Sequence, residues 1–405
     1  MSEQFEMIAK TFQGLEEILA EELTTLGAND IQIGRRMVSF TGDKRMMYKA
    51  NFCLRTAIRI LKPIKNFTAK DADEVYNQIQ AIPWEEYLDV NKTFAIDAVV
   101  FSEEFRHSKF VSYKVKDAIV DYFREKTGKR PSVRINNPDV LLNIHIAHTT
   151  CTLSLDSSGE SLHRRGYRQE QVEAPLNEVL AAGMVLMTGW PGECDLIDPM
   201  CGSGTIPIEA ALIARNIAPG VFRKGFAFEK WVDFDSEMFD EIYNDDSQER
   251  EFTHKIYGYD NSPKANEIAT HNIKAAGVSK DVTLKLQPFQ QFEQPQEKSI
   301  IVMNPPYGGN EKEGVKQNFP ADLRSSETAD LFMSVIMYRL KQNGRCAIIL
   351  PDGFLFGTDN AKMAIKEKLL SEFNLHTVIR MPHSVFAPYT SITTNILFFD
   401  RTHPT

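Results

Sequence analysis

The spacing of hydrophobic positions follows two different patterns, which divide the chain into two regions. From about residue 175 onward, short apolar runs alternate with helical patterns in which apolar residues recur every three or four positions. The expected strands are 195–198, 256–260, 282–286, 299–303, 345–350, 375–380 and 394–400. The expected helices lie near 205–215, 263–276, 329–342 and 360–372. This alternation predicts an α/β fold with a seven-stranded, doubly wound sheet.

The first 156 residues have a different, mixed pattern. Residues 5–10 indicate a strand, and five leucine and isoleucine positions from Leu15 to Leu26 have helical spacing that Gly27 can end. A second helix is expected near 112–126. Residues 142–146 and 151–155 alternate between apolar and polar, which is typical of a hairpin. We therefore expect an α+β region here. Residues 216–254 interrupt the alternation of strands and helices in the second region and are expected to form an acidic surface insertion.

Composition favours a globular protein of two or three domains. The chain has 405 residues, of which 42% are hydrophobic and 25% charged. We see neither an apolar run long enough to span a membrane nor a secretory signal at the start. Five scattered cysteines without a CxxC pair predict a reducing, cytoplasmic location with neither disulfides nor a metal site.

The net charge of −9 is unevenly distributed. Residues 1–165 contain 23 basic and 23 acidic side chains, whereas the remainder contains 23 basic and 32 acidic ones. A neutral first region can still present a locally basic face to a nucleic acid, because local charge density matters more than the net value.

A glycine-containing turn follows the expected strand 195–198. Its polar and small residues are Asp198, Pro199, Cys201, Gly202, Ser203, Gly204 and Thr205. Ligands bind at the carboxyl ends of strands in such sheets, and glycines let the backbone approach them closely. An ordinary strand–helix turn is the alternative. The sequence lacks GxxxxGK[ST], which disfavours a phosphate-binding P-loop.

The next strand ends in Asp260 and Asn261. An acidic side chain at this place can accept both hydroxyls of a ribose. It could equally cap the helix expected at 263–276.

The apolar run 299–303 does not alternate, which predicts a strand buried on both faces. The residues that stop it are Asn304, Pro305, Pro306 and Tyr307. The Asn304 side-chain carbonyl and the Pro305 backbone carbonyl can accept both hydrogens of an exocyclic amine, and Tyr307 offers a face for base stacking. A simple strand-ending turn is the alternative.

These motifs, in this order, resemble the Rossmann-like S-adenosylmethionine-dependent methyltransferases that modify amino groups. The resemblance implies that residues 198–205 wrap the methionine moiety, Asp260 holds the ribose, and residues 304–307 hold the target base. The segment 174–178, which contains Leu176, resembles an additional cofactor-contacting motif of that family. Gln287 and Pro288 stand at the adenine position, where many relatives have Asp.

The densest basic stretch surrounds the expected helix 112–126. The candidate RNA-binding residues are Arg106, His107, Lys109, Lys114, Lys129, Arg130, Arg164 and Arg165. A solvated helix face is the alternative, because acidic residues dilute this stretch.

Up to Gly308 the chain resembles bacterial 23S rRNA guanine-N2 methyltransferases, on the segments KTFQGLEEILAEEL, SEEFRHSKFVSYKVKDAIVDYFREKTGKRPSV and SLHRRGYR. The resemblance implies a ferredoxin-like segment at 1–60, a THUMP RNA-binding domain at 61–156 and a methyltransferase domain at 165–405. It also implies S-adenosylmethionine as cofactor and 23S rRNA as partner.

After Gly308 the resemblance changes. Segments such as GGNEKEGVKQNFP and GRCAIILPDGFLFG are similar to type I restriction-modification adenine-N6 DNA methyltransferase subunits. An adenine-N6 methyltransferase acting on DNA or RNA is therefore the alternative function. A non-catalytic RNA-binding factor is the third.

Overall fold

The computed structural model describes residues 3–105, 107–292, 298–306 and 309–405, which form two compact units. The first unit comprises Met1–Phe12, Leu19–Arg164 and Arg223–Asp245. The second comprises Gln13–Ile18, Arg165–Phe222 and Asp246–Thr405. Among the described residues, no helix combines the length and the apolar content needed to cross a membrane. All five cysteines are free thiols.

The first unit is built on an eight-stranded sheet with the order β2-β3-β1-β4-β8-β7-β5-β6. Its strands are β1 (Phe5–Lys10), β2 (Asn29–Gly34), β3 (Met37–Gly42), β4 (Arg59–Thr68), β5 (Thr93–Phe101), β6 (Ser132–Val133), β7 (Val140–Ala147) and β8 (Thr150–Asp156). The antiparallel pairing of β7 with β8 confirms the expected hairpin. This unit therefore has the mixed architecture that its sequence pattern predicted.

The helices of the first unit are α1 (Glu16–Leu26), whose first residues belong to the second unit, α2 (Lys44–Cys53), α3 (Ala72–Gln80), α4 (Ser108–Thr127) and α7 (Ser236–Tyr243). Short 3₁₀ turns lie at Trp84–Glu86 and Ala227–Lys230. The Phe228 ring stacks on Tyr48 with centroids 4.3 Å apart. This aromatic contact explains why part of the insertion folds with the first unit.

The second unit contains a seven-stranded sheet with the order β11-β10-β9-β12-β13-β15-β14. Its strands are β9 (Asp195–Asp198), β10 (Ile256–Asp260), β11 (Val282–Leu286), β12 (Ser299–Met303), β13 (Arg345–Pro351), β14 (Asn374–Arg380) and β15 (Thr394–Asp400). All seven expected strands are confirmed. The sheet is mixed, because β15 lies antiparallel between β13 and β14 while the other strands run parallel.

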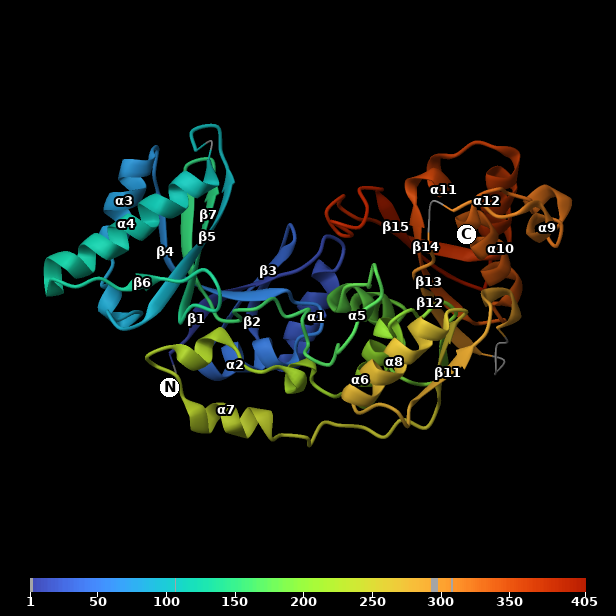
Figure 1. The fold of residues 1–405 in the computed structure, drawn as a ribbon, viewed down its shortest axis with the longest axis horizontal. Coiled ribbons are helices and arrows are strands. Elements are labelled where there is room, and N and C mark those ends of the chain that lie inside the picture. Colours follow the sequence, from blue (N-terminus) through green and yellow to red (C-terminus); the bar gives the residue numbers. More distant parts are fainter. Residues whose placement is uncertain (1–2, 106, 293–297, 307–308) are drawn as a thin grey trace. The chain divides into compact units, whose positions relative to one another are not determined.

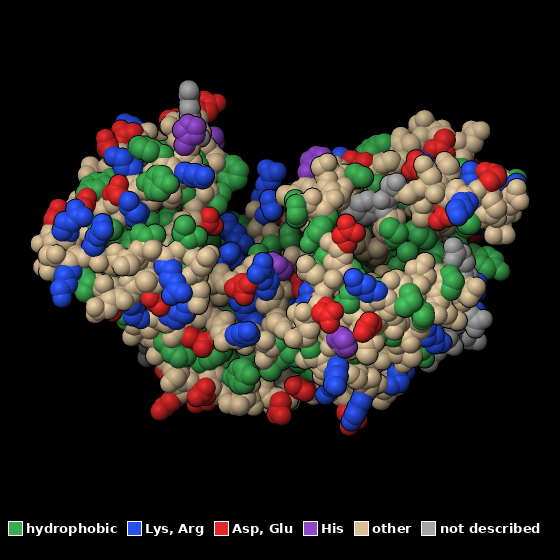
Figure 2. Space-filling view, in the orientation of Figure 1, with side chains coloured by type: hydrophobic (Ala, Val, Ile, Leu, Met, Phe, Trp, Pro, Cys, Tyr) green, Lys and Arg blue, Asp and Glu red, His purple; other side chains and the backbone are tan. Residues whose placement is uncertain are grey.

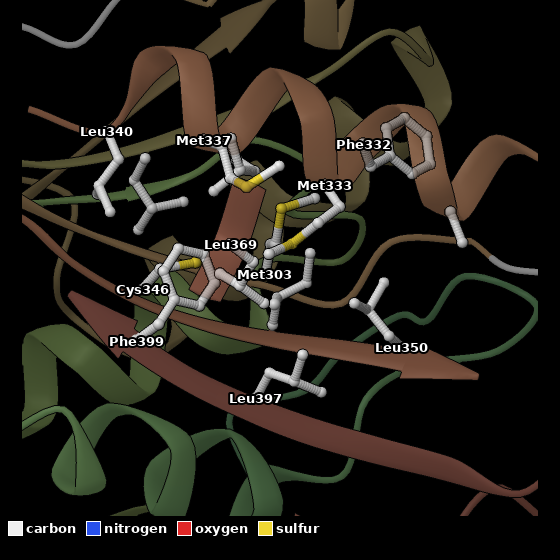
Figure 3. Close-up of a cluster of buried hydrophobic side chains, with 14 of the residues drawn as sticks. Met303, Phe332, Met333, Met337, Leu340, Cys346, Leu350, Leu369, Leu397 and Phe399 are labelled. Atoms are coloured by element: carbon white, nitrogen blue, oxygen red, sulfur yellow. The ribbon is translucent and has the colours of Figure 1, made fainter. Parts of the chain in front are cut away.

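Helices cover both faces of this sheet (Figures 1 and 3). The main ones are α5 (Glu178–Met187), α6 (Thr205–Arg215), α8 (Pro263–Ala275), α10 (Thr328–Arg339) and α12 (Asn360–Glu372). The shorter ones are α9 (Glu313–Lys316), α11 (Asp352–Phe356) and 3₁₀ turns at Pro219–Phe222, Phe289–Gln291 and Ala321–Leu323. In Figure 3 the green helices of the α5–α6 region lie on one side of the strands, and the helix carrying Met333 and Met337 lies on the other. The fold is therefore doubly wound.

Strand β12 is the central element of the core. All five of its residues are buried, as its unbroken apolar run predicted. Met303 points into the cluster formed with Met333, Met337 and Leu350 (Figure 3). Burial on both faces fixes the strand firmly, so the residues that follow Met303 leave the sheet from a rigid position.

Candidate functional site

A cavity of about 610 Å³ lies in the second unit, at the carboxyl ends of β9, β10 and β12. Three motifs expected from the sequence line it: the turn after β9, the pair Asp260 and Asn261, and the residues Asn304 to Pro306. The segment 174–176 ahead of α5 completes one wall. Parallel strands bring their carboxyl ends to a common edge, and this is how motifs about 50 residues apart meet.

The turn after β9 is bent by two glycines in the left-handed region. Gly202 has φ +52° and Gly204 has φ +83°. A Cβ at Gly204 would lie 3.3 Å from the Cβ of Ala269 on α8. Side chains at these places would strain the backbone, and at Gly204 they would also press on α8. The glycines therefore keep the turn tight and its backbone accessible from the cavity.

Asp260 holds this turn and does not cap α8. Its Oδ2 accepts a hydrogen bond from the Gly202 N–H at 3.0 Å, and its Oδ1 accepts one from the Ser262 N–H at 2.9 Å. The helix cap is Ser262, whose hydroxyl accepts from the Ala265 N–H. Asp260 thus stands at the cavity with lone pairs left on both oxygens.

Asp198 is a buried carboxyl at the end of β9, only 1% exposed. It accepts the Met200 N–H at 3.0 Å. Burial raises the pKa of Asp198 well above its ordinary value, and the nearby charge of Asp260 raises that pKa further. Both carboxyls line the cavity, and Asp198 is the more deeply buried of the two.

The hydroxyls of Ser203 and Thr205 both accept hydrogen bonds from Arg168, at 2.9 Å each. Both residues are 3% exposed, so these hydroxyls point into the protein. Arg168 was not among the residues expected at the site, although it closes the SLHRRGYR segment. Nothing in the spacing of the motifs indicated that the arginine would reach the turn.

Asn304 begins the segment that leaves β12. Its side-chain Oδ1 is buried and has no hydrogen-bond partner among the described residues. An unpaired buried carbonyl costs free energy and is unusual in a folded protein. Pro305 is buried and Pro306 exposed, and both line the cavity. Tyr307 lies outside the described residues, so its stacking role stays a prediction.

Several lining residues were missed by the sequence analysis. They are Val172, Ile206, Phe289, Thr328, Phe332, Phe386, Tyr389 and Thr390. Met200 also lines the cavity, from within the expected turn 198–205. Phe289 packs edge-to-face on Phe332 with centroids 4.7 Å apart. Gln287 and Pro288, which were expected at the adenine position, are not among the described residues that line the cavity. The missed residues come from helices α6 and α10 and from loops far apart in the chain, which local patterns cannot bring together.

Apart from Arg165, the candidate RNA-binding residues fall into three groups. His107, Lys109, Lys129 and Arg130 are exposed around α4, and the part of the chain that the structure describes provides no ion-pair partner for them. Lys114 pairs with Asp73 at 2.6 Å, and Arg164 with Glu160 at 2.6 Å. Arg106 lies outside the described residues.

Arg165 requires a correction. This guanidinium is 1% exposed and pairs with Glu209 at 3.2 Å, and Glu209 also accepts the Tyr167 hydroxyl at 2.8 Å. A buried charge of this kind is retained because it is paired and hydrogen-bonded. The expectation that Arg165 contacts RNA is therefore wrong for this conformation, because no surface of the side chain is available to a phosphate.

Comparisons with known proteins identify each region of the chain. The RMKL-like methyltransferase domain matches residues 165–377, the THUMP domain residues 69–156, and the RlmL ferredoxin-like domain residues 6–61. The methyltransferase match runs well past Gly308, where the sequence resemblance changes.

Two relatives and one solved structure illustrate the similarity. Ribosomal RNA large subunit methyltransferase K/L of Syntrophotalea carbinolica is 40% identical over 320 residues, covering 76% of this chain and 45% of that protein. A Synechocystis protein named as RNA methyltransferase slr0064 is 37% identical over 302 residues, covering 74% of this chain and 79% of that protein. The structure of SMU.472, described as a methyltransferase and solved with SAH, superposes with a TM-score of 0.80 at 25% identity over 100% of both chains.

The chain spans less than half of the length of the K/L relatives that it matches. One family match nevertheless covers more than half of this chain, and slr0064 is matched over most of its length. The chain therefore belongs to the RMKL-like methyltransferase family, with ferredoxin-like and THUMP domains ahead of its methyltransferase domain.

Proposed function

We propose that this chain transfers a methyl group from S-adenosylmethionine to the exocyclic N2 amine of a guanine in 23S rRNA. The observation that carries the proposal is the buried Oδ1 of Asn304, which has no hydrogen-bond partner among the described residues and stands beside a cavity that the glycine turn also lines. A group that costs free energy when unpaired gains most from a ligand that donates to it. The K/L relatives are named for the large ribosomal RNA, and the THUMP match supports an RNA substrate.

The cavity fits the cofactor in size and in chemistry. Its volume of about 610 Å³ is in the range of small-molecule sites. When bound, S-adenosylmethionine supplies an electrophilic methyl group on a sulfonium. Asp260 would accept the ribose hydroxyls, and the backbone of the glycine turn would lie against the methionine part. The Phe289–Phe332 pair offers an apolar surface in the same cavity.

Asn304 and Pro305 would hold the target amine. An aromatic amine is a weak nucleophile because its lone pair is delocalised into the ring. Two carbonyl acceptors, from the Asn304 side chain and the Pro305 backbone, draw electron density toward the nitrogen and aim its lone pair along one direction. Such positioning is worth several kcal/mol of the barrier. The proton lost after alkylation can pass to water, so no dedicated base is needed.

Glu311 favours guanine over adenine as the target. Its side chain lines the cavity and has no ion-pair partner among the described residues. A carboxylate accepts the N1–H of guanine, whereas adenine presents a lone pair at N1 that the carboxylate would repel. At this place Glu311 would accept a hydrogen bond from guanine and repel adenine, which supports guanine as the proposed target.

The first unit would bind the RNA backbone and stack on unpaired bases. Phe110 and Tyr113 are 52% and 59% exposed on α4, beside the unpaired Lys109. On the face shown in Figure 2, basic and hydrophobic side chains intermingle over the region of α4 and β6, with acidic ones between them. Cations interleaved with exposed aromatic rings suit single-stranded RNA.

The test is methylated-nucleoside analysis by mass spectrometry after incubating the protein and S-adenosylmethionine with unmodified rRNA and, separately, with duplex DNA. We expect N2-methylguanosine in the rRNA and no methylated base in the DNA. N6-methyladenine in either nucleic acid would overturn the assignment in favour of the alternative enzyme. An intact protein that binds no S-adenosylmethionine would favour a non-catalytic RNA-binding factor. The Asn304→Ala variant is the inactive control.

A further inference from the structure

Arg168 joins two segments that form walls of the cavity. Its Nη1 donates to the Ser203 hydroxyl at 2.9 Å, and its Nη2 donates to the Thr205 hydroxyl at 2.9 Å. The same Nη2 donates to the Leu176 carbonyl at 3.1 Å. Leu176 lies in the segment ahead of α5, whereas Ser203 and Thr205 belong to the turn after β9. One guanidinium thus connects parts of the chain about 30 residues apart.

We propose that Arg168 is the positioning residue that sets the shape of the cofactor cavity by locking the 174–176 segment to the glycine turn. The inference rests on the proposed function. Arg168 is not itself among the described residues that line the cavity, so it acts through its partners. The guanidinium is the side chain suited to this task, because its donors lie in a rigid plane and can serve several acceptors at fixed angles.

The position of Arg168 is itself fixed from two directions. Its Nε lies 2.9 Å from the Glu178 Oε1, and the two side chains are 15% and 6% exposed. Asn272 of α8 makes a second connection, because its Nδ2 donates to the carbonyls of both Glu170 and Ser203. The loop segment that carries Arg168 is therefore held against the glycine turn by two side chains, those of Arg168 and Asn272. Such an arrangement favours a preformed cavity over one that closes around its ligand.

Arg165 provides a matched control three residues earlier. It forms a similarly buried pair with Glu209, at 3.2 Å, but Arg165 and Glu209 are not among the described cavity-lining residues. A substitution of either arginine weakens a buried ion pair. The Arg168 guanidinium donates directly to Leu176, Ser203 and Thr205, which line the cavity, whereas the ion-pair partner of Arg165, Glu209, is not among the described lining residues.

The experiment compares Arg168→Lys with Arg165→Lys in the full chain. Lysine keeps the charge beside each glutamate. Its three N–H donors lie on one nitrogen, however, and cannot reach the four acceptors that the three guanidinium nitrogens of Arg168 serve. Binding of S-adenosylhomocysteine is measured by calorimetry, thermal unfolding is recorded for each variant, and steady-state kinetics on rRNA give KM for the cofactor and kcat. A second variant, Arg168→Met with Glu178→Met, removes both charges so that no uncompensated ion remains buried.

We expect both Arg168 variants to weaken S-adenosylhomocysteine binding and to raise the cofactor KM by about tenfold or more, the size of effect typical of residues that orient a binding site. In Arg168→Lys, kcat at saturating cofactor should stay within about threefold of the parent, because the target amine is held elsewhere. Arg165→Lys should keep the affinity within about twofold.

An unchanged affinity in Arg168→Lys would overturn the inference, and so would an equal loss in Arg165→Lys, since the effect would then be a general loosening of the fold. A parent protein that binds no S-adenosylhomocysteine would instead overturn the proposed function, and with it the inference.

Discussion

The carboxylate of Asp260 accepts the backbone N–H of Gly202 across 3.0 Å, which links the ends of β10 and β9. The bond fixes the glycine turn from the side of the neighbouring strand. A further hydrogen bond from the Cys201 N–H to the Tyr259 carbonyl, at 2.8 Å, runs beside it. The turn is therefore shaped before any ligand arrives, and Asp260 has a structural role as well as the one proposed toward a ribose.

Replacing Asp260 with Asn should weaken binding of S-adenosylmethionine by about tenfold to a hundredfold, since a hydrogen bond to a charged group contributes about 1.5–3 kcal/mol. The amide nitrogen of Asn cannot accept from Gly202 while its oxygen serves Ser262. Calorimetric titration measures the change. Ser262→Ala is the control, because it removes only the α8 cap, which costs about 1 kcal/mol of stability. The proposed ribose contact would be contradicted by equal affinity losses in the two variants.

Asp198 should make stability depend on pH in a recognisable direction. Burial raises the pKa of its carboxyl in the folded protein above the value in the unfolded chain. A raised carboxyl pKa means that the folded state holds the proton more tightly, so ionisation at neutral pH lowers the free energy of unfolding. Asp198→Asn cannot ionise. It should be more stable than the parent at neutral pH, and this advantage should shrink as the pH falls through the folded pKa toward that of an unfolded Asp.

Urea unfolding of both proteins across this pH range measures the difference. A stability gap that stays constant with pH would show that Asp198 does not titrate in the expected way. The variant should also bind S-adenosylmethionine less well, because the family resemblance places Asp198 at the methionine moiety. If Asp198→Asn is more stable than the parent but binds S-adenosylmethionine less well, the carboxyl of Asp198 serves cofactor binding at a cost in stability.

Sequence patterns predicted the strands and the polar groups at their ends, but not the side-chain contacts that connect those groups. The run 299–303 predicted a fully buried strand because every position is apolar, and β12 is such a strand. The partner of Ser203 and Thr205 could not be foreseen, since Arg168 reaches them through tertiary packing. Arg165 was misread for the same reason, because a basic residue in a polar segment gives no sign that Glu209 will bury it. The antiparallel insertion of β15 between β13 and β14 likewise depends on chain topology, which periodicity does not encode.

Neutralising Lys109 and Arg130 together should weaken RNA binding and flatten its dependence on salt. Each lost phosphate contact reduces the slope of log affinity against log salt by about 1. Arg124→Gln with Lys126→Gln is the matched control, since these helix residues already pair with Asp121 and Glu85. Filter binding of an rRNA fragment at several salt concentrations gives the slopes. If the double variant keeps the parent slope, Lys109 and Arg130 belong to an ordinary solvated helix face.

Asn304→Ala should reduce methyl transfer to a small residual rate while leaving cofactor affinity nearly unchanged. The Asn304 Oδ1, which has no partner among the described residues, is at the carboxyl end of β12, where the amine acceptor is expected, and not in the glycine turn proposed to hold the methionine moiety. Loss of one preorganised acceptor typically lowers kcat about a hundredfold to a thousandfold. Removing a buried carbonyl without a partner should also leave stability unchanged or slightly raised. Single-turnover transfer to rRNA, calorimetry with S-adenosylhomocysteine and thermal unfolding separate these effects. Parallel losses of transfer and cofactor affinity would mean that Asn304 shapes the cofactor site, and the amine would then need another acceptor.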